Sequence, residues 1–319
     1  MKKTILIISS VLFGLMSIKA QSGKPVVKIF SNFNYDLSNE DSENAFKEFE
    51  IKRAYLGYSH EINENFSTNI TYDIGSNNSG SSYTAFLKIA ALKWKATDNM
   101  SINIGMIGTK NFKFMEKVWG RRYIDKSAQD KYKWASAADA GVSMDYKLTD
   151  NVSLDAQVLN GEGYKKTQSD NGLFRGGMGI TFKALDNLSL RVHHDISPRS
   201  TYDDMSESQS ITTAAIAYAS DNITLGAETG MMKNVNNVKD EEENLISVYG
   251  SIKLSESFTL FARHDDVSET SEYGTYTIYG LERKMAKGVT VALNMQSWTD
   301  SSDGAEAENT LYLNLEYKF

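Results

Sequence analysis

Cysteine is absent from the 319 residues of this chain, and proline occurs only twice. A chain without thiols has no disulfide, no cysteine-ligated iron–sulfur cluster, no thiol nucleophile and no lipoprotein anchor on cysteine. The four histidines, His60, His193, His194 and His264, stand in no recognisable nucleophile motif and in no spacing typical of metal ligands. We therefore expect no catalytic site, no bound metal and no cofactor.

Long apolar runs and an excess of positive charge are also missing. After residue 20 no segment approaches about 18 consecutive apolar residues, which excludes a transmembrane helix. The 34 basic residues face 41 acidic ones, so nucleic acid is not an expected partner. Residues 1–20 are predicted to be a secretory signal peptide, because Lys2 and Lys3 precede a short apolar core and Ala20 precedes a plausible cleavage point.

What the sequence does contain is one short pattern, repeated along the chain. A polar group such as Asp-Asn is followed by an apolar residue, a Ser or Thr and a second apolar residue. Its seven copies begin at Asn63, Asp98, Asp150, Asp186, Asp221, Glu256 and Lys287. Asp, Asn and Gly tolerate the backbone angles of tight turns, and the flanking alternation of apolar and polar residues is typical of strands. Seven hairpins and one strand at each end predict about 16 strands.

The last strand, from Thr310 to Phe319, alternates apolar and polar residues and ends on an aromatic side chain. This ending resembles the C-terminal signal of bacterial outer-membrane β-barrels, so Tyr317 and Phe319 are predicted to be read by the β-barrel assembly machinery. A closed barrel also leaves no unpaired strand edge in lipid. We therefore predict an all-β protein in the outer membrane, surrounded by lipid and lipopolysaccharide. Residues 21–319 would form a closed antiparallel transmembrane barrel with short periplasmic turns and long extracellular loops.

The strands after each turn have one apolar and one polar face. The apolar face is expected to contact lipid and the polar face to line a water-filled pore, for which a barrel of this size is wide enough. The polar face carries arginines that could form a ladder and carboxylates that could pair with them. These are Arg53, Arg175, Arg191 and Arg263, and Asp73, Asp139, Asp145, Asp155, Glu228 and Asp265. The sequence His193-His194-Asp195 is interpreted as an aqueous rim feature.

The third long loop, residues 109–134, has an excess of positive charge. It contains Lys110, Lys113, Lys117, Arg121, Arg122, Lys126, Lys131 and Lys133 against three acidic residues. The loop also has more apolar surface than a solvated loop normally shows, including Trp119 and Trp134. If it folds into the barrel, it constricts the pore and its charge favours anions. If it is solvated at the cell surface, its charge has no part in passage, and the sequence leaves both alternatives open.

Four segments together resemble the phosphate-selective porin O and P family, in a Bacteroidetes-type form. They are Phe49 to Tyr58, Leu87 to Ala91, Met100 to Met106 and Lys117 to Arg122. The resemblance implies a 16-stranded, trimeric porin that passes small hydrophilic solutes by diffusion. It further implies a preference for anions such as phosphate, which depends on arginines and lysines whose equivalents are placed at Arg53, Arg121 and Arg122.

Two other functions fit parts of the pattern. A structural or adhesive barrel would have an occluded lumen and would bind a partner through its loops. An outer-membrane lipid hydrolase would need a Ser–His pair, for which His193 and His194 offer no recognisable context. The sequence therefore predicts a porin that is not an enzyme and that passes small hydrophilic solutes or anions.

Overall fold

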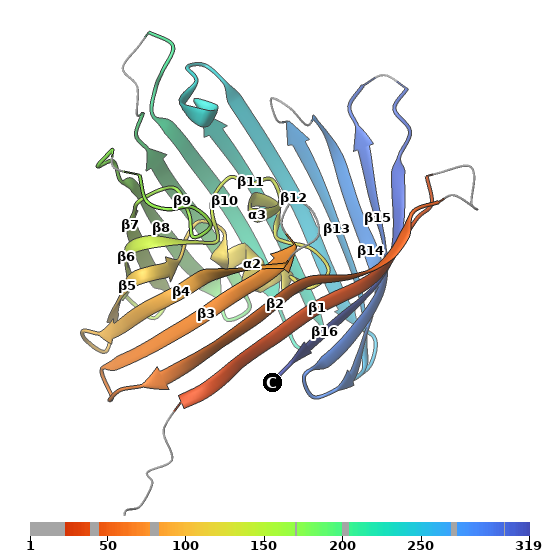
Figure 1. Ribbon diagram of the computed structural model, residues 1–319, viewed down its shortest axis with the longest axis horizontal. Coiled ribbons are helices and arrows are strands. Elements are labelled where there is room, and N and C mark those ends of the chain that lie inside the picture. The colour runs from red at the N-terminus through yellow and green to blue at the C-terminus, as the bar shows by residue number, and fades with distance from the viewer. Residues whose placement is uncertain are drawn as a thin grey trace, which may run out of the picture.

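Sixteen antiparallel strands form a closed barrel in the computed structural model, and this confirms the predicted fold class. The structure describes residues 23–38, 45–76, 83–169, 171–199, 204–268, 273–302 and 304–319. The predicted signal peptide and parts of several long loops lie outside the described residues. Each strand pairs with its neighbours in the sequence, and β16 pairs with β1 to close the barrel (Figure 1).

The strands contain between 8 and 15 residues, which is long enough to cross a bilayer at a tilt. In chain order they are β1 (Gly23–Asp36), β2 (Lys47–Glu61), β3 (Phe66–Ser76), β4 (Tyr83–Lys95), β5 (Met100–Gly108), β6 (Ala138–Lys147), β7 (Val152–Leu159), β8 (Arg175–Leu185), β9 (Leu188–Ser197), β10 (Gln209–Ala219), β11 (Ile223–Lys233), β12 (Glu242–Lys253), β13 (Phe258–Ser268), β14 (Tyr273–Ala286), β15 (Val289–Asp300) and β16 (Glu308–Lys318).

All seven expected turns join consecutive strands, at the end of the barrel where the C-terminus lies (Figure 1). In the turn after β6, the hydroxyl of Thr149 accepts hydrogen bonds from the backbone N–H groups of Asn151 and Val152 at 3.2 and 3.0 Å. In the turn after β14, Gly288 has φ +78°, and a Cβ there would lie 2.2 Å from the carbonyl oxygen of Lys318. Glycine adopts this positive φ at little cost and has no Cβ to clash with Lys318, so it fits this turn beside the closing strand.

The two faces of the strands differ as the sequence predicts. Apolar side chains on the outer face, such as Val158, Leu225 and Leu293, are about half exposed. Polar residues that point inward from the same strands, such as Gln157 and Asn294, are buried. An apolar outer wall over polar inward positions is the arrangement of transmembrane barrels, so the predicted register is confirmed.

The third loop, between β5 and β6, lies inside the barrel and forms α2 (Lys113–Trp119) and α3 (Ala128–Lys131) (Figure 1). Met115 and Trp119, one turn apart on α2, are buried, whereas Lys113 and Lys117 lie on the exposed side of the helix. Gly120 ends the helix with φ +66°, a backbone conformation that glycine adopts at little cost.

None of the described helices is long and apolar enough to cross a lipid bilayer.

Apolar side chains of this loop fill one side of the lumen. Trp119 packs edge-on against Tyr249 of β12 and Phe261 of β13, with ring centroids 5.6 and 6.2 Å apart. Tyr132 and Trp134 belong to a second buried cluster with Ile211, Leu245 and Val267 from the same side of the barrel. The expectation that every inward polar side chain contacts water is therefore wrong on this side of the barrel, because the third loop covers it.

Candidate functional site

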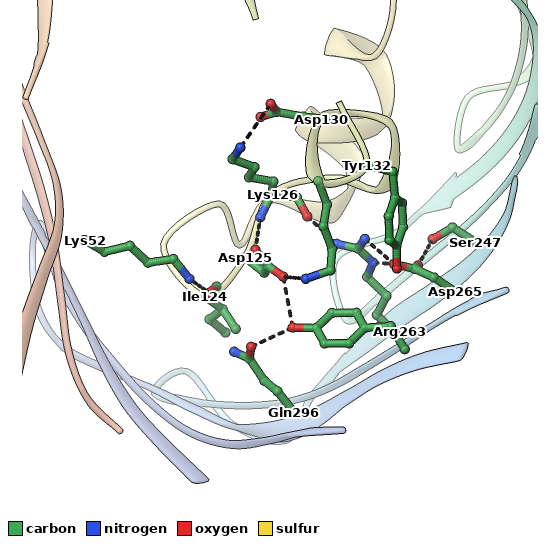
Figure 2. A network of polar contacts seen from close by, with 12 residues as sticks. Lys52, Ile124, Asp125, Lys126, Asp130, Tyr132, Ser247, Arg263, Asp265 and Gln296 are labelled. Atoms are coloured by element: carbon green, nitrogen blue, oxygen red, sulfur yellow. Dashed lines mark hydrogen bonds and ion pairs between the residues drawn. The ribbon is translucent and has the colours of Figure 1, made fainter. Parts of the chain in front are cut away.

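A buried polar network holds the third loop to the barrel wall (Figure 2). The carboxylate of Asp125 accepts hydrogen bonds from the Lys131 ammonium at 3.0 Å and from the Tyr276 hydroxyl at 2.9 Å. Burial opposes ionisation, but the nearby charges of Lys131 and Lys52 hold the pKa of Asp125 well below its usual value. The stability that this charge contributes is complete above the usual carboxyl pKa and is lost only in strong acid.

A second anchor joins the loop to β13. The guanidinium of Arg263 pairs with Asp265 and donates a hydrogen bond to the carbonyl oxygen of Lys126 in the loop (Figure 2). Asp265 also accepts hydrogen bonds from Ser247 at 2.6 Å and from Tyr132 at 3.2 Å. The side chains of Arg263 and Asp265 are fully buried, so each depends on the other for its charge partner.

Two β-bulges bring lysines into the lumen from the opposite side of the barrel. The pairing of β1 with β2 skips Lys52, and the pairing of β3 with β4 skips Lys88. A bulge changes which face the next side chains point to. As a result, Lys52 and Arg53 both point inward, and the Lys52 ammonium donates a hydrogen bond to the Ile124 carbonyl oxygen at 2.9 Å (Figure 2).

Asp73 of β3 is the centre of a cluster on this opposite wall. It accepts hydrogen bonds from Arg53 at 3.2 Å and from the Tyr164 hydroxyl at 2.6 Å. The Lys88 ammonium lies 3.6 Å from the same carboxylate and 4.8 Å from the ring centroid of Tyr55. Asp73 is completely buried; Arg53 and Lys88 on the wall balance its charge, and Tyr164 in the loop after β7 adds a hydrogen bond.

Cavities remain on both sides of the third loop. The cavity on the side of the long loops has a volume of about 830 Å³ and a strongly basic lining. Its charged residues are Arg53, Arg122, Lys126, Lys131, Lys133, Lys165, Lys166 and Arg175, and Asp130, Glu162 and Glu243. A cavity of about 480 Å³ lies toward the short turns and is lined by Lys93, Lys110 and Lys113 among others. We call these the outer cavity and the inner cavity.

Most of the twelve cations expected at the pore or constriction are paired with carboxylates. The paired ones are Arg53, Lys110, Arg121, Arg122, Lys126, Lys131, Arg175, Arg191 and Arg263. Lys113, Lys117 and Lys133 are exposed and pair with no carboxylate among the described residues. The arginines on the wall therefore balance nearby acids, and these three lysines carry charge without a local partner.

Residues that the sequence analysis did not select also belong to the site. Lys52 and Lys88 were missed because strict alternation does not reveal a bulge, and Tyr164 and Lys165 because they lie in a different loop from the cationic one. The interpretation of His193 and Asp195 as an aqueous rim is wrong, since each is 1% exposed and points inward. In the part of the chain that the structure describes, no group of three or more His, Asp or Glu residues could hold a metal ion.

Comparison with known proteins identifies the fold. Among curated protein sequences none matches this chain significantly. An anion-selective porin from Comamonas acidovorans superposes with a TM-score of 0.69 at 10% identity, covering 94% of this chain and 100% of that one. OmpF of Salmonella typhi, in complex with daunomycin, gives 0.69 at 12% identity over 94% and 98%. The channel DcaP of Acinetobacter baumannii gives 0.67 at 12% identity over 93% and 97%.

The sequence also matches a family model over part of its length. Residues 27–111 match phosphate-selective porin O and P, so the resemblance seen in the strands around Phe49 to Tyr58 is confirmed over that range. This range contains both bulges and the wall that carries Asp73. The chain is therefore an integral β-barrel of the bacterial outer membrane with the fold of the porins, and its residues 27–111 carry the match to the phosphate-selective porin O and P family.

Proposed function

We propose that the barrel is a passive diffusion pore for small hydrophilic solutes and that it prefers anions. The observation that carries the preference is the outer cavity, whose lining contains eight cationic and three acidic side chains; among the described residues, its Lys133, Lys165 and Lys166 form no ion pair. A basic cavity enclosed by low-dielectric walls raises the local concentration of anions. The family match over residues 27–111 and the shared fold with an anion-selective porin support the same conclusion.

The third loop is the proposed constriction. It occupies the lumen between the outer and inner cavities, and its contacts with Arg263, Tyr276 and Lys52 hold it in place. The paired arginines add little net charge, whereas Lys113, Lys117 and Lys133 present unpaired charge to water. The proposal is therefore a preference for small anions as a class, with phosphate as one of them. Such a pore needs no enzymatic activity, and we propose none.

Conductance measurements in planar bilayers test this function directly. The purified protein should produce discrete current steps, and a salt gradient should give a reversal potential of the sign for anion preference. Increasing salt should reduce the preference, because exposed lysines are screened. A barrel that inserts without conducting would favour an occluded structural or adhesive role, and a cation-selective reversal potential would contradict the anion preference alone.

The proposed assembly is a homotrimer surrounded by lipopolysaccharide on the side of the long loops. Phe319 is 79% exposed and directly follows the closing strand, at the end of the barrel with the short turns, where its backbone pairs with Val27. An exposed aromatic side chain at this position fits recognition by the assembly machinery. We expect a heat-sensitive trimer band on semi-native electrophoresis of outer membranes, and much less of it for Phe319→Ala. Equal amounts of the two would contradict the role of Phe319, and a monomer band alone would contradict the trimer.

A further inference from the structure

We propose that the segment 161–165 in the loop after β7 is a second constriction element, and that Lys165 faces the path of the solute. The inference rests on the proposed function, since it assumes that solutes cross the lumen. The loop after β7 is a separate segment from the third loop, and it covers a different part of the barrel wall. It starts at β7 but reaches the cluster around Asp73 on β3, so it passes along the inner wall of the intervening strands.

Two carboxylates hold this segment in place. The backbone N–H of Gly161 donates a hydrogen bond to Asp139 of β6 at 2.7 Å, and the backbone N–H of Tyr164 donates one to the Ala138 carbonyl oxygen at 3.0 Å. At its other end, the Tyr164 hydroxyl donates to Asp73 at 2.6 Å. Both acidic residues lie on strands and are buried, so the contacts are with a fixed wall. Gly161 and Gly163 have φ of +110° and +82°, which lets the chain turn sharply into the lumen.

Aromatic rings and lysine ammonium groups lie next to one another at the tip of the segment. The Tyr164 ring meets Phe86 of β4 edge-on at 6.3 Å, and the Lys88 ammonium lies 5.4 Å from the Tyr164 centroid. The Lys165 ammonium lies 5.3 Å from the centroid of Phe86. Lys88 is largely buried, whereas Lys165 is exposed. The segment therefore fixes Tyr164 against the wall and leaves Lys165 exposed beside the two rings.

This exposed lysine faces the third loop across the outer cavity. Lys165 and Tyr164 line that cavity together with Arg122 and Lys126 of the third loop and Arg53 of β2. A solute that passes through the outer cavity has the third loop on one side and segment 161–165 on the other. Charge on both sides of a narrow passage affects selectivity more than charge on one side, because a solute cannot avoid it. Lys165 is thus proposed as a specificity-determining residue.

Cysteine labelling provides a sharp test, because the natural chain has no cysteine and a Lys165→Cys variant has one thiol. The variant would be incorporated into planar bilayers and treated with sulfonatoethyl or trimethylammonioethyl methanethiosulfonate. We expect either adduct to narrow the passage and to lower single-channel conductance by about twofold. The sulfonate should also shift the reversal potential toward cations, whereas the trimethylammonium should restore the anion preference of the lysine.

A matched control is Ser302→Cys, an exposed position in the loop after β15 that does not line either cavity. Its complete labelling should leave conductance and reversal potential unchanged. Failure of the thiol at position 165 to react, or complete labelling without a change in current, would overturn the second constriction. A wild-type barrel that does not conduct would instead overturn the proposed function, so the two failures can be distinguished.

Discussion

Replacing Arg263 by methionine should loosen the third loop and make the open-channel current unstable. The substitution leaves the buried Asp265 carboxylate with hydrogen bonds from Ser247 and Tyr132 but with no cation, and it removes the bond to the Lys126 carbonyl oxygen. Removing one partner of a buried ion pair costs about 3–5 kcal/mol. Methionine keeps part of the contact that the guanidinium makes with the Trp119 ring, at 5.5 Å from its centroid, so the loss is mainly one of charge balance.

Thermal unfolding in detergent and single-channel recording would measure this loss. We expect a lower unfolding temperature, excess noise and brief closures, because the loop can leave the wall and enter the path. Adding Asp265→Asn should recover a large part of both effects, since an amide can still bond to Ser247 and needs no cation. Lys183→Met, which breaks an exposed ion pair with Asp186 in a periplasmic turn, should have no measurable effect. Wild-type stability and a quiet current in Arg263→Met would show that the apolar contacts alone hold the loop.

The strands and turns could be predicted because local chemistry determines them. The turn after β6 needs a hydroxyl that accepts backbone N–H groups and residues that adopt tight-turn angles, and Thr149-Asp150-Asn151 supplies both. The outward face of a barrel must be apolar where it contacts the lipid bilayer, so alternation in the sequence translates directly into register. Neither inference needs knowledge of distant residues, which is why the number of strands was correct.

The site could be predicted only in part because it depends on distant contacts and on local breaks in the pattern. Strict alternation counted back from Trp94 would direct Lys88 outward, and only the bulge at Lys88, which pairs with neither Thr71 nor Tyr72, turns it inward. The charge excess of the third loop is visible in the sequence, but the wall residues that bind the loop are spread from Lys52 on β2 to Glu282 on β14. No short-range pattern indicates which of these cations are balanced.

Replacing Lys113, Lys117 and Lys133 by glutamate should reverse the ion preference of the pore. These side chains are exposed in the lumen and pair with no carboxylate among the described residues, so their charge acts on passing ions. Lys113 lines the inner cavity and Lys133 the outer one, and the substitutions therefore change the field along the whole passage. Focused fields of this kind alter local ion concentrations by about tenfold or more. We expect the reversal potential in a salt gradient to change sign.

A charge-neutral control separates this effect from any change in loop structure. Arg121 and Glu282 form an ion pair at 3.2 Å between the third loop and β14, and converting both to glutamine leaves the net charge of the lumen unchanged. The double variant should keep the wild-type reversal potential, whereas replacing the three lysines by glutamate should change its sign. If neutralising the pair shifts selectivity as much as reversing the lysines does, then the balanced arginines determine the preference and the unpaired lysines do not. The two outcomes differ because a paired charge and its partner cancel at the distance of a passing ion, and a solvated lysine has no such partner.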